Sequence, residues 1–162
     1  MKLLVFTEGT LLIHKAWAGL SREEMVQRNK ATLDANDFAA SVPVGNAVTK
    51  LQTWQRQGAE ISYLTSRTKP NEIDEVRASL TRFGFPEGQL WFRQPGEGYK
   101  DVAEKVRPDV LIEDDCESIG GEIEMTYPHL RTDFKTRLGS IVVKEFGGID
   151  HLPDSLSDLA GH

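Results

Sequence analysis

The chain has 162 residues, of which 39% are hydrophobic and 27% are charged, a composition that is ordinary for a single globular domain. Its net charge of −6 and its pI of about 5.2 argue against a nucleic-acid binder that works through a broad basic face. The apolar run 3–6 is too short for a signal peptide or a membrane span, and the single cysteine, Cys116, excludes an internal disulfide. We therefore expect one cytoplasmic domain over residues 1–162 that binds neither nucleic acid nor membrane.

Strand-like and helix-like segments alternate along the chain. Short apolar runs rich in β-branched or aromatic residues predict strands at 2–6, 60–64, 89–92, 109–113 and 140–143. Apolar residues at helical spacing predict helices at 45–57, 71–83 and 99–107, with a short one at 154–160. The alternation indicates an α/β fold, a five-stranded parallel sheet with helices on both faces. In such a sheet the ligand lies beyond the carboxyl ends of the strands.

Residues 12–44 separate the first strand from the first core helix and predict a small helical insert. Ser21 and Glu24 form a plausible capping box for a helix over about 21–34. The apolar face of that helix, formed by Met25, Val26 and Leu33, is thin, and Trp17 and Phe38 are expected to anchor it. Because the insert offers little material for a lid, we expect the site to be open or to be completed by a second copy in a homo-oligomer.

Four polar elements follow the predicted strands or begin a helix. They are Thr7-Glu8-Gly9-Thr10 after the first strand, Thr65-Ser66-Arg67 after the second, Lys100 at the start of a helix, and Glu113-Asp114-Asp115 after the fourth strand. A lysine and a hydroxyl can hold the oxygens of a phosphoryl group, and carboxylates suit Mg²⁺, which is a hard ion. These residue types are therefore compatible with a site for a metal ion and a small phosphorylated molecule.

These four elements, in this order, resemble the motifs of the haloacid dehalogenase (HAD) superfamily over roughly residues 2–120. The resemblance implies a HAD-like (Rossmann-like) three-layer α/β sandwich and a Mg²⁺-dependent phosphohydrolase that acts on a phosphomonoester. It implies acid/base work and metal binding by Glu8, and phosphoryl binding by Thr65 and Lys100. It also implies that the substrate is contacted by these residues: Thr7, Gly9, Thr10, Ser66 and Arg67. Asp114 becomes the main metal ligand, with either Glu113 or Asp115 beside it.

The first motif departs from the family pattern at Phe6. In the family an aspartate at this position attacks phosphorus, as carboxylate nucleophiles can, and a phenyl ring cannot. Four alternatives stay open: Thr7 attacks after a one-residue shift of the strand, Glu8 attacks as a carboxylate, a water activated by the metal attacks, or nothing attacks. In the last case the chain is a HAD-like phosphate-binding or regulatory protein.

Each candidate residue also has a simpler structural interpretation. Asp114 and Asp115 could cap a helix, Thr65 could belong to a turn, and Lys100 could be a solvated surface lysine. Arg67 could pair with a surface carboxylate. Cys116 is interpreted as structural, because neighbouring carboxylates raise the pKa of a thiol and weaken it as a nucleophile.

Overall fold

The structure is a computed structural model, and it describes residues 1–31 and 41–161. Five parallel strands form the main sheet in the order β5-β4-β1-β6-β7. Their bounds are Lys2–Phe6 (β1), Glu60–Leu64 (β4), Leu90–Trp91 (β5), Val110–Asp114 (β6) and Gly139–Val143 (β7). The predicted α/β class with a five-stranded parallel sheet is confirmed. Because β1 is central and pairs with both β4 and β6, the ends of these three strands lie side by side.

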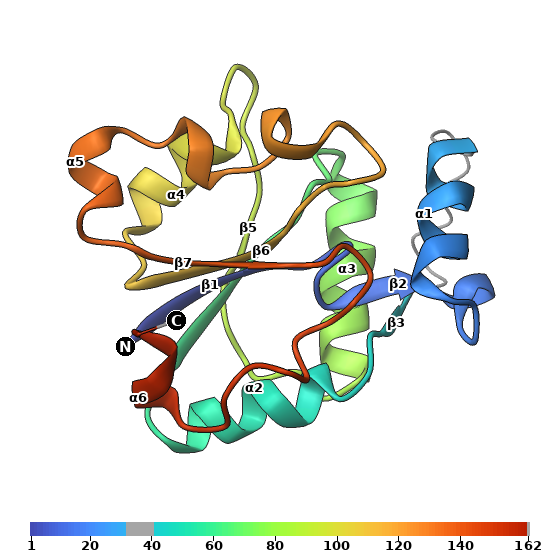
Figure 1. The fold of residues 1–162 in the computed structure, drawn as a ribbon, viewed down its shortest axis with the longest axis horizontal. Coiled ribbons are helices and arrows are strands. Elements are labelled where there is room, and N and C mark those ends of the chain that lie inside the picture. Colours follow the sequence, from blue (N-terminus) through green and yellow to red (C-terminus); the bar gives the residue numbers. More distant parts are fainter. Residues whose placement is uncertain (32–40, 162) are drawn as a thin grey trace.

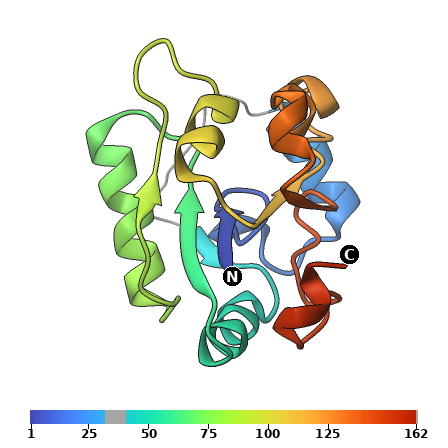
Figure 2. The same cartoon turned by 90° about the vertical axis from the view of Figure 1, so that its left-hand side faces the viewer.

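Helices cover both faces of the sheet (Figures 1 and 2). One face packs against α2 (Ala47–Arg56), α3 (Pro70–Arg82) and α6 (Leu156–Leu159), and the other packs against α4 (Tyr99–Val106) and α5 (Thr132–Lys135). Alternation along β1 divides its side chains between the two cores. Leu3 and Val5 enter the first, and Leu4 and Phe6 enter the second. Phe6 is therefore part of an apolar core as well as the last residue of its strand.

Residues between β1 and α2 contain a small antiparallel pair that the sequence did not predict. β2 (Leu12–His14) pairs with β3 (Ser41–Pro43), and η1 (Lys15–Trp17) and α1 (Arg22–Ala31) follow β2. Figure 1 shows α1 standing to one side of the sheet, beyond this pair. A small apolar cluster supports the segment: Ile13, Met25, Val26, Val44 and Phe146, with Trp17 packed against it. Residues 32–34 of the predicted helix and Phe38 lie outside the described residues, so the extent of the insert stays a prediction.

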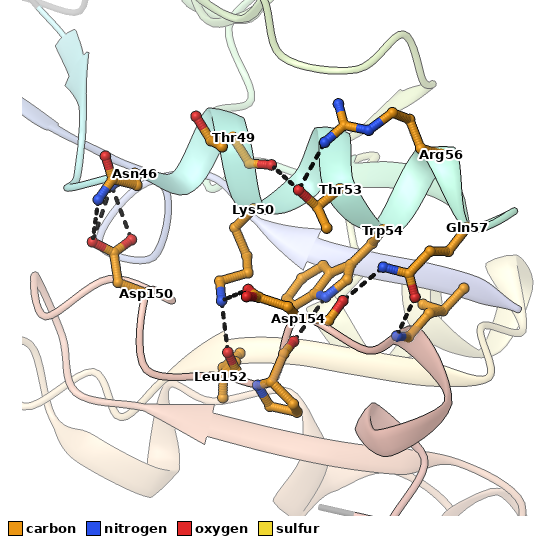
Figure 3. A network of polar contacts seen from close by, with 12 residues as sticks. Asn46, Thr49, Lys50, Thr53, Trp54, Arg56, Gln57, Asp150, Leu152 and Asp154 are labelled. Atoms are coloured by element: carbon orange, nitrogen blue, oxygen red, sulfur yellow. Dashed lines mark hydrogen bonds and ion pairs between the residues drawn. The ribbon is translucent and has the colours of Figure 1, made fainter.

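The last part of the chain runs alongside α2 and is held there by polar contacts (Figure 3). The buried Lys50 ammonium donates to the Leu152 carbonyl at 2.7 Å and pairs with Asp154 at 2.5 Å. The Trp54 indole donates to the Pro153 carbonyl at 2.9 Å. These contacts close one face of the main core. Two short 3-10 helices, η3 (Gly121–Ile123) and η4 (Tyr127–His129), lie between β6 and α5.

Within the described ranges 1–31 and 41–161, none of the helices has the length and apolar character that a membrane crossing requires.

Candidate functional site

The turn after β1 brings the first predicted motif against the end of β6. Gly9 has a φ of +82°, and a Cβ built on it would lie 2.8 Å from Asp114 Oδ2. A side chain at position 9 would therefore be strained and would also displace Asp114. The turn also places Thr10 beside Asp114, and the buried Thr10 hydroxyl donates to Asp114 Oδ2 at 2.9 Å. Thr7 is fully buried, and its hydroxyl donates to the Leu64 carbonyl at 3.3 Å.

Glu8 extends toward the end of β4, where three consecutive residues meet one of its oxygens. Glu8 Oε1 accepts a short hydrogen bond from the Thr65 hydroxyl and another at 3.1 Å from the Ser66 hydroxyl. Arg67 Nε lies 3.3 Å from the same oxygen. The other oxygen, Oε2, is buried and has no hydrogen-bond partner among the described residues. Burial lowers the pKa of Arg67, and the negative charge of Glu8 opposes that shift.

Asp114 lies at the centre of the acidic region. Its side chain is only 4% exposed, and it accepts hydrogen bonds from Thr10 and from the Cys116 backbone N–H, the latter at 3.0 Å. Burial raises the pKa of Asp114 to about 7, and the nearby carboxylates of Glu145 and Glu113 add to the shift. Burial and Asp114 likewise raise the pKa of the Cys116 thiol, which agrees with a structural role for this cysteine.

A third carboxylate, which the sequence reasoning missed, joins Asp114 and Asp115. Glu145 follows β7, and one carboxylate oxygen of each of the three residues lies within 4.8 Å of the others. The Glu145 carboxylate is held by two bonds of 2.7 Å from the Ser118 backbone and hydroxyl, and burial raises its pKa. Asp115 accepts from the Glu145 backbone N–H at 3.1 Å and pairs with Lys144 at 3.1 Å. An acidic residue just after a predicted strand was the available signal for Glu145.

Glu113 does not join this group, which corrects its assignment as a candidate metal ligand. Both of its carboxylate oxygens accept backbone hydrogen bonds, from Thr126 at 2.7 Å and from Tyr127 at 2.9 Å. Successive residues of a strand point to opposite faces, so Glu113 and Asp114 cannot both face one ion. Glu113 instead fixes the segment that follows β6, and Glu145 replaces it in the candidate ligand set.

Aromatic packing surrounds Phe6 at the end of β1. The Phe6 ring is 8% exposed and lies edge-on to the Tyr99 ring at the start of α4. The Arg93 guanidinium lies over the Tyr99 ring, with its central carbon 4.3 Å from the ring centroid, and it donates to the Ser66 carbonyl at 3.2 Å. Burial raises the pKa of Tyr99 to about 12. A chain of contacts therefore runs from Phe6 to the loop that holds Glu8.

Lys100 lies apart from the Glu8 contacts, as an exposed side chain on the wall of a cavity of about 300 Å³. Arg93 and Tyr99 line the same cavity, together with Gly98, Ile123, Glu124, Met125 and His129. The cavity therefore shares two walls with the aromatic packing around Phe6. Arg93 was not singled out from the sequence, although it directly follows a predicted strand. The roles of Glu8, Thr65 and Lys100 stay predictions.

Comparison with known proteins supports the fold. No protein-family model and no curated protein matches the chain. It is similar to two structures of the class C acid phosphatase from Bacillus anthracis. The one with tungstate bound has 17% identity and a TM-score of 0.56, over 91% of this chain and 68% of the phosphatase. The other has 16% identity and a TM-score of 0.57, over 99% of this chain and 77% of the phosphatase.

A structure of the Pnkp1/Rnl/Hen1 complex is similar at 13% identity and a TM-score of 0.54, over 89% of this chain and 46% of that one. At such identities the likeness concerns the fold alone. That fold is the α/β sandwich with a five-stranded parallel sheet expected from the sequence.

Proposed function

We propose that the protein is a Mg²⁺-dependent phosphohydrolase that acts on a small phosphomonoester, with Glu8 as general acid and base. One observation carries the proposal. The Glu8 carboxylate is held through one oxygen by donors at the end of β4, while its other oxygen has no hydrogen-bond partner among the described residues. It follows β1, the strand beside the one that ends in Asp114. A phosphatase of similar fold binds tungstate, which is an oxyanion.

The donor set fits a hard divalent cation. Asp114, Asp115 and Glu145 supply carboxylate oxygens that lie close together, which are the ligands Mg²⁺ takes in proteins. The raised pKa of Asp114 indicates that its ionised form lacks a compensating positive charge. When bound, the ion would neutralise phosphoryl oxygens and stabilise the charge that develops on them.

The chain supplies groups for the remaining work. Thr65, Ser66 and Arg67 offer two hydroxyl donors and one cation for the phosphoryl oxygens, and Lys100 offers a second cation. The bond that forms joins a water oxygen to phosphorus, and the bond that breaks joins phosphorus to the ester oxygen. Glu8 takes the proton from the attacking water and returns it to the leaving alkoxide, so charge and atoms balance.

Water is the nucleophile in this proposal because, among the residues that the structure describes, neither Phe6 nor Thr7 at the end of β1 can attack. Phe6 cannot attack, and the Thr7 hydroxyl is buried with its proton directed at the Leu64 carbonyl. Attack by the Glu8 carboxylate would remove the group that must handle the proton.

The packing of Phe6 favours a second candidate, a protein that binds a phosphorylated ligand without turning it over. Phe6 belongs to the core under α4, so the position that carries the nucleophile in the HAD family is closed here. This candidate keeps the oxyanion donors and the acidic group and lacks only the chemical step.

Phosphate release from a panel of phosphomonoesters, measured with Mg²⁺ and with EDTA, tests the proposal. We expect Mg²⁺-dependent release that falls by at least about 100-fold in Glu8→Ala, the range of acid–base contributions. Asp114→Asn removes a proposed metal ligand and should also lower the rate. The matched control Glu104→Ala removes a glutamate with a similar exposure, 19% against 20%, that also pairs with an arginine. It should retain activity.

An inert wild-type protein would contradict the hydrolase. If Phe6→Asp then acquired phosphatase activity, the second candidate would replace it.

A further inference from the structure

The contacts of Glu8 describe an anion site that is already filled by the protein's own carboxylate. Thr65 is fully buried, and its hydroxyl accepts the Arg67 backbone N–H at 3.2 Å, which directs its own proton toward Glu8. Ser66 and Arg67 approach the same oxygen from the loop that follows β4. Two hydroxyl donors and one cation therefore converge on a single carboxylate oxygen.

The backbone of this loop is fixed on both sides. The Thr65 backbone N–H donates to the Trp91 carbonyl of β5 at 3.0 Å, and the Ser66 carbonyl accepts from Arg93 at 3.2 Å. Arg93 is in turn stacked on Tyr99. Donors held in this way do not need to rearrange to receive an anion, which is the condition for a preorganised oxyanion site.

We propose that Thr65, Ser66 and Arg67 form an oxyanion cradle and that Glu8 is its resident anion in the ligand-free protein, so that a phosphate group enters by displacing Glu8. The inference deepens the proposed function, on which it rests for the identity of the ligand. Two anions cannot share these donors, because like charges at such separations repel strongly in a partly buried site. Glu8 and phosphate therefore compete.

The competition connects the resting position of Glu8 to its proposed chemical role. A carboxylate displaced by a phosphoryl group remains on the short turn at residues 7–10, which is held by Thr10 and Asp114. It therefore stays beside the group that displaced it, where an acid and base is required. In the absence of phosphate the same carboxylate compensates the partly buried Arg67 cation, whose pKa burial lowers.

Equilibrium binding of inorganic phosphate in EDTA, followed by calorimetry, tests this inference without the metal. We expect Glu8→Ala to bind phosphate about tenfold or more tightly than the wild type, because the resident competitor is gone. Glu8→Gln, which keeps the volume and removes the charge, should shift affinity in the same direction by a smaller factor. The double variant Glu8→Ala/Arg67→Gln should lose the gain.

Glu104→Ala is the matched control and should bind phosphate like the wild type, since its partner Arg131 lies in a different part of the fold. Circular dichroism checks that each variant is folded, and Glu8→Gln carries the test if Glu8→Ala is not. Equal or weaker phosphate binding by the folded Glu8 variants would overturn the inference, as would a gain that survives loss of the Arg67 charge.

The experiments on phosphate binding and on phosphate release test the two proposals separately. The cradle predicts that Glu8→Ala binds phosphate more tightly, and the hydrolase predicts that the same variant releases phosphate more slowly. If the wild-type protein is inactive and Glu8→Ala binds phosphate more tightly, the oxyanion cradle is supported and the phosphohydrolase function is rejected.

Discussion

The ring of Phe6 meets the ring of Tyr99 edge-on, with centroids 4.9 Å apart and an interplanar angle of 79°. This pair joins the end of β1 to the start of α4 and belongs to a core cluster that also contains these side chains: Leu4, Leu64, Val102, Leu111 and Leu130. Phe6 is thus a packing residue of the second core, and its loss should be felt as lost stability.

Phe6→Ala should lower the free energy of unfolding by about 3 kcal/mol, since it removes a buried ring and leaves a cavity. Phe6→Leu retains most of the apolar volume and should cost about 1 kcal/mol. Urea unfolding monitored by fluorescence measures both. A cost below about 1 kcal/mol for the alanine variant would show that the ring contributes little to the core.

Gly9→Ala should disturb both the turn after β1 and Asp114. The new Cβ would lie 2.8 Å from Asp114 Oδ2. Gly19→Ala is a matched control, because Gly19 has a similar φ of +88° and open space where a Cβ would lie. The control should cost about 1–2 kcal/mol from backbone strain alone. Gly9→Ala should cost more by urea unfolding, and equal costs for the two variants would exclude a steric role for Asp114.

The stability of the metal-free protein should fall as pH rises toward neutrality. The folded-state pKa of Asp114 is about 7, above its ordinary value of 3.8, so the folded state binds this proton more tightly than the unfolded state. Ionisation of Asp114 therefore costs folding free energy. This cost is absent below about pH 4, grows between about pH 4 and pH 7, and is complete above about pH 7. Asp114→Asn cannot ionise and should be more stable than the wild type at pH 8 by at least about 1 kcal/mol.

Urea unfolding in EDTA at pH 4.5 and pH 8 measures that difference. Glu113 and Glu145 also have raised pKa values, so some pH dependence should persist in the variant. An Asp114→Asn protein that is no more stable than the wild type at pH 8 would contradict the prediction.

Mg²⁺ should stabilise the folded protein through the carboxylates of Asp114, Asp115 and Glu145. At a concentration ten times its dissociation constant, the ion adds about 1.4 kcal/mol, which corresponds to roughly 3–6 °C in a domain of this size. Asp114→Asn should abolish most of the shift, whereas Asp133→Asn, an exposed aspartate on α5, should leave it intact. A melting temperature that does not depend on Mg²⁺ would remove the ion from the proposed mechanism.

Lys50 contacts Leu152 and Asp154 of the C-terminal segment (Figure 3) and should therefore stabilise the attachment of that segment. Lys50→Met keeps much of the buried stem but leaves the Leu152 carbonyl without its donor, which costs about 1–3 kcal/mol. Asp154→Asn should cost less than about 0.5 kcal/mol, because Asp154 is 82% exposed and its ion pair is largely screened. Similar costs for the two variants would locate the stabilisation in the ion pair instead.

The local sequence pattern was sufficient to predict the main strands and helices of the fold. The predicted strands 2–6 and 60–64 coincide with β1 and β4, and 109–113 differs from β6 by one residue at each end. Helix 71–83 was predicted with Pro70 at its start, and α3 begins at Pro70. These features follow from hydrophobic period and from proline and glycine at helix ends, which act over a few neighbouring residues.

The pair β2–β3 escaped prediction because each strand has three residues and its partner lies far along the chain. Such pairing depends on the rest of the fold and leaves little periodic signal in the sequence. The same limit applied to Glu145, which reaches Asp114 only because β7 pairs with β6.

The sequence by itself determined the α/β class, the parallel sheet, and the strand ends at which polar residues gather, since all of these follow from local periodicity. Only the tertiary structure decided what those residues face. It turned Glu113 toward the backbone of Thr126 and Tyr127, and it brought the hydroxyls of Thr65 and Ser66 to Glu8. The physical reason is that a side chain's partners come from strands and loops far away in the sequence, and their distances and directions are set only when the sheet is assembled.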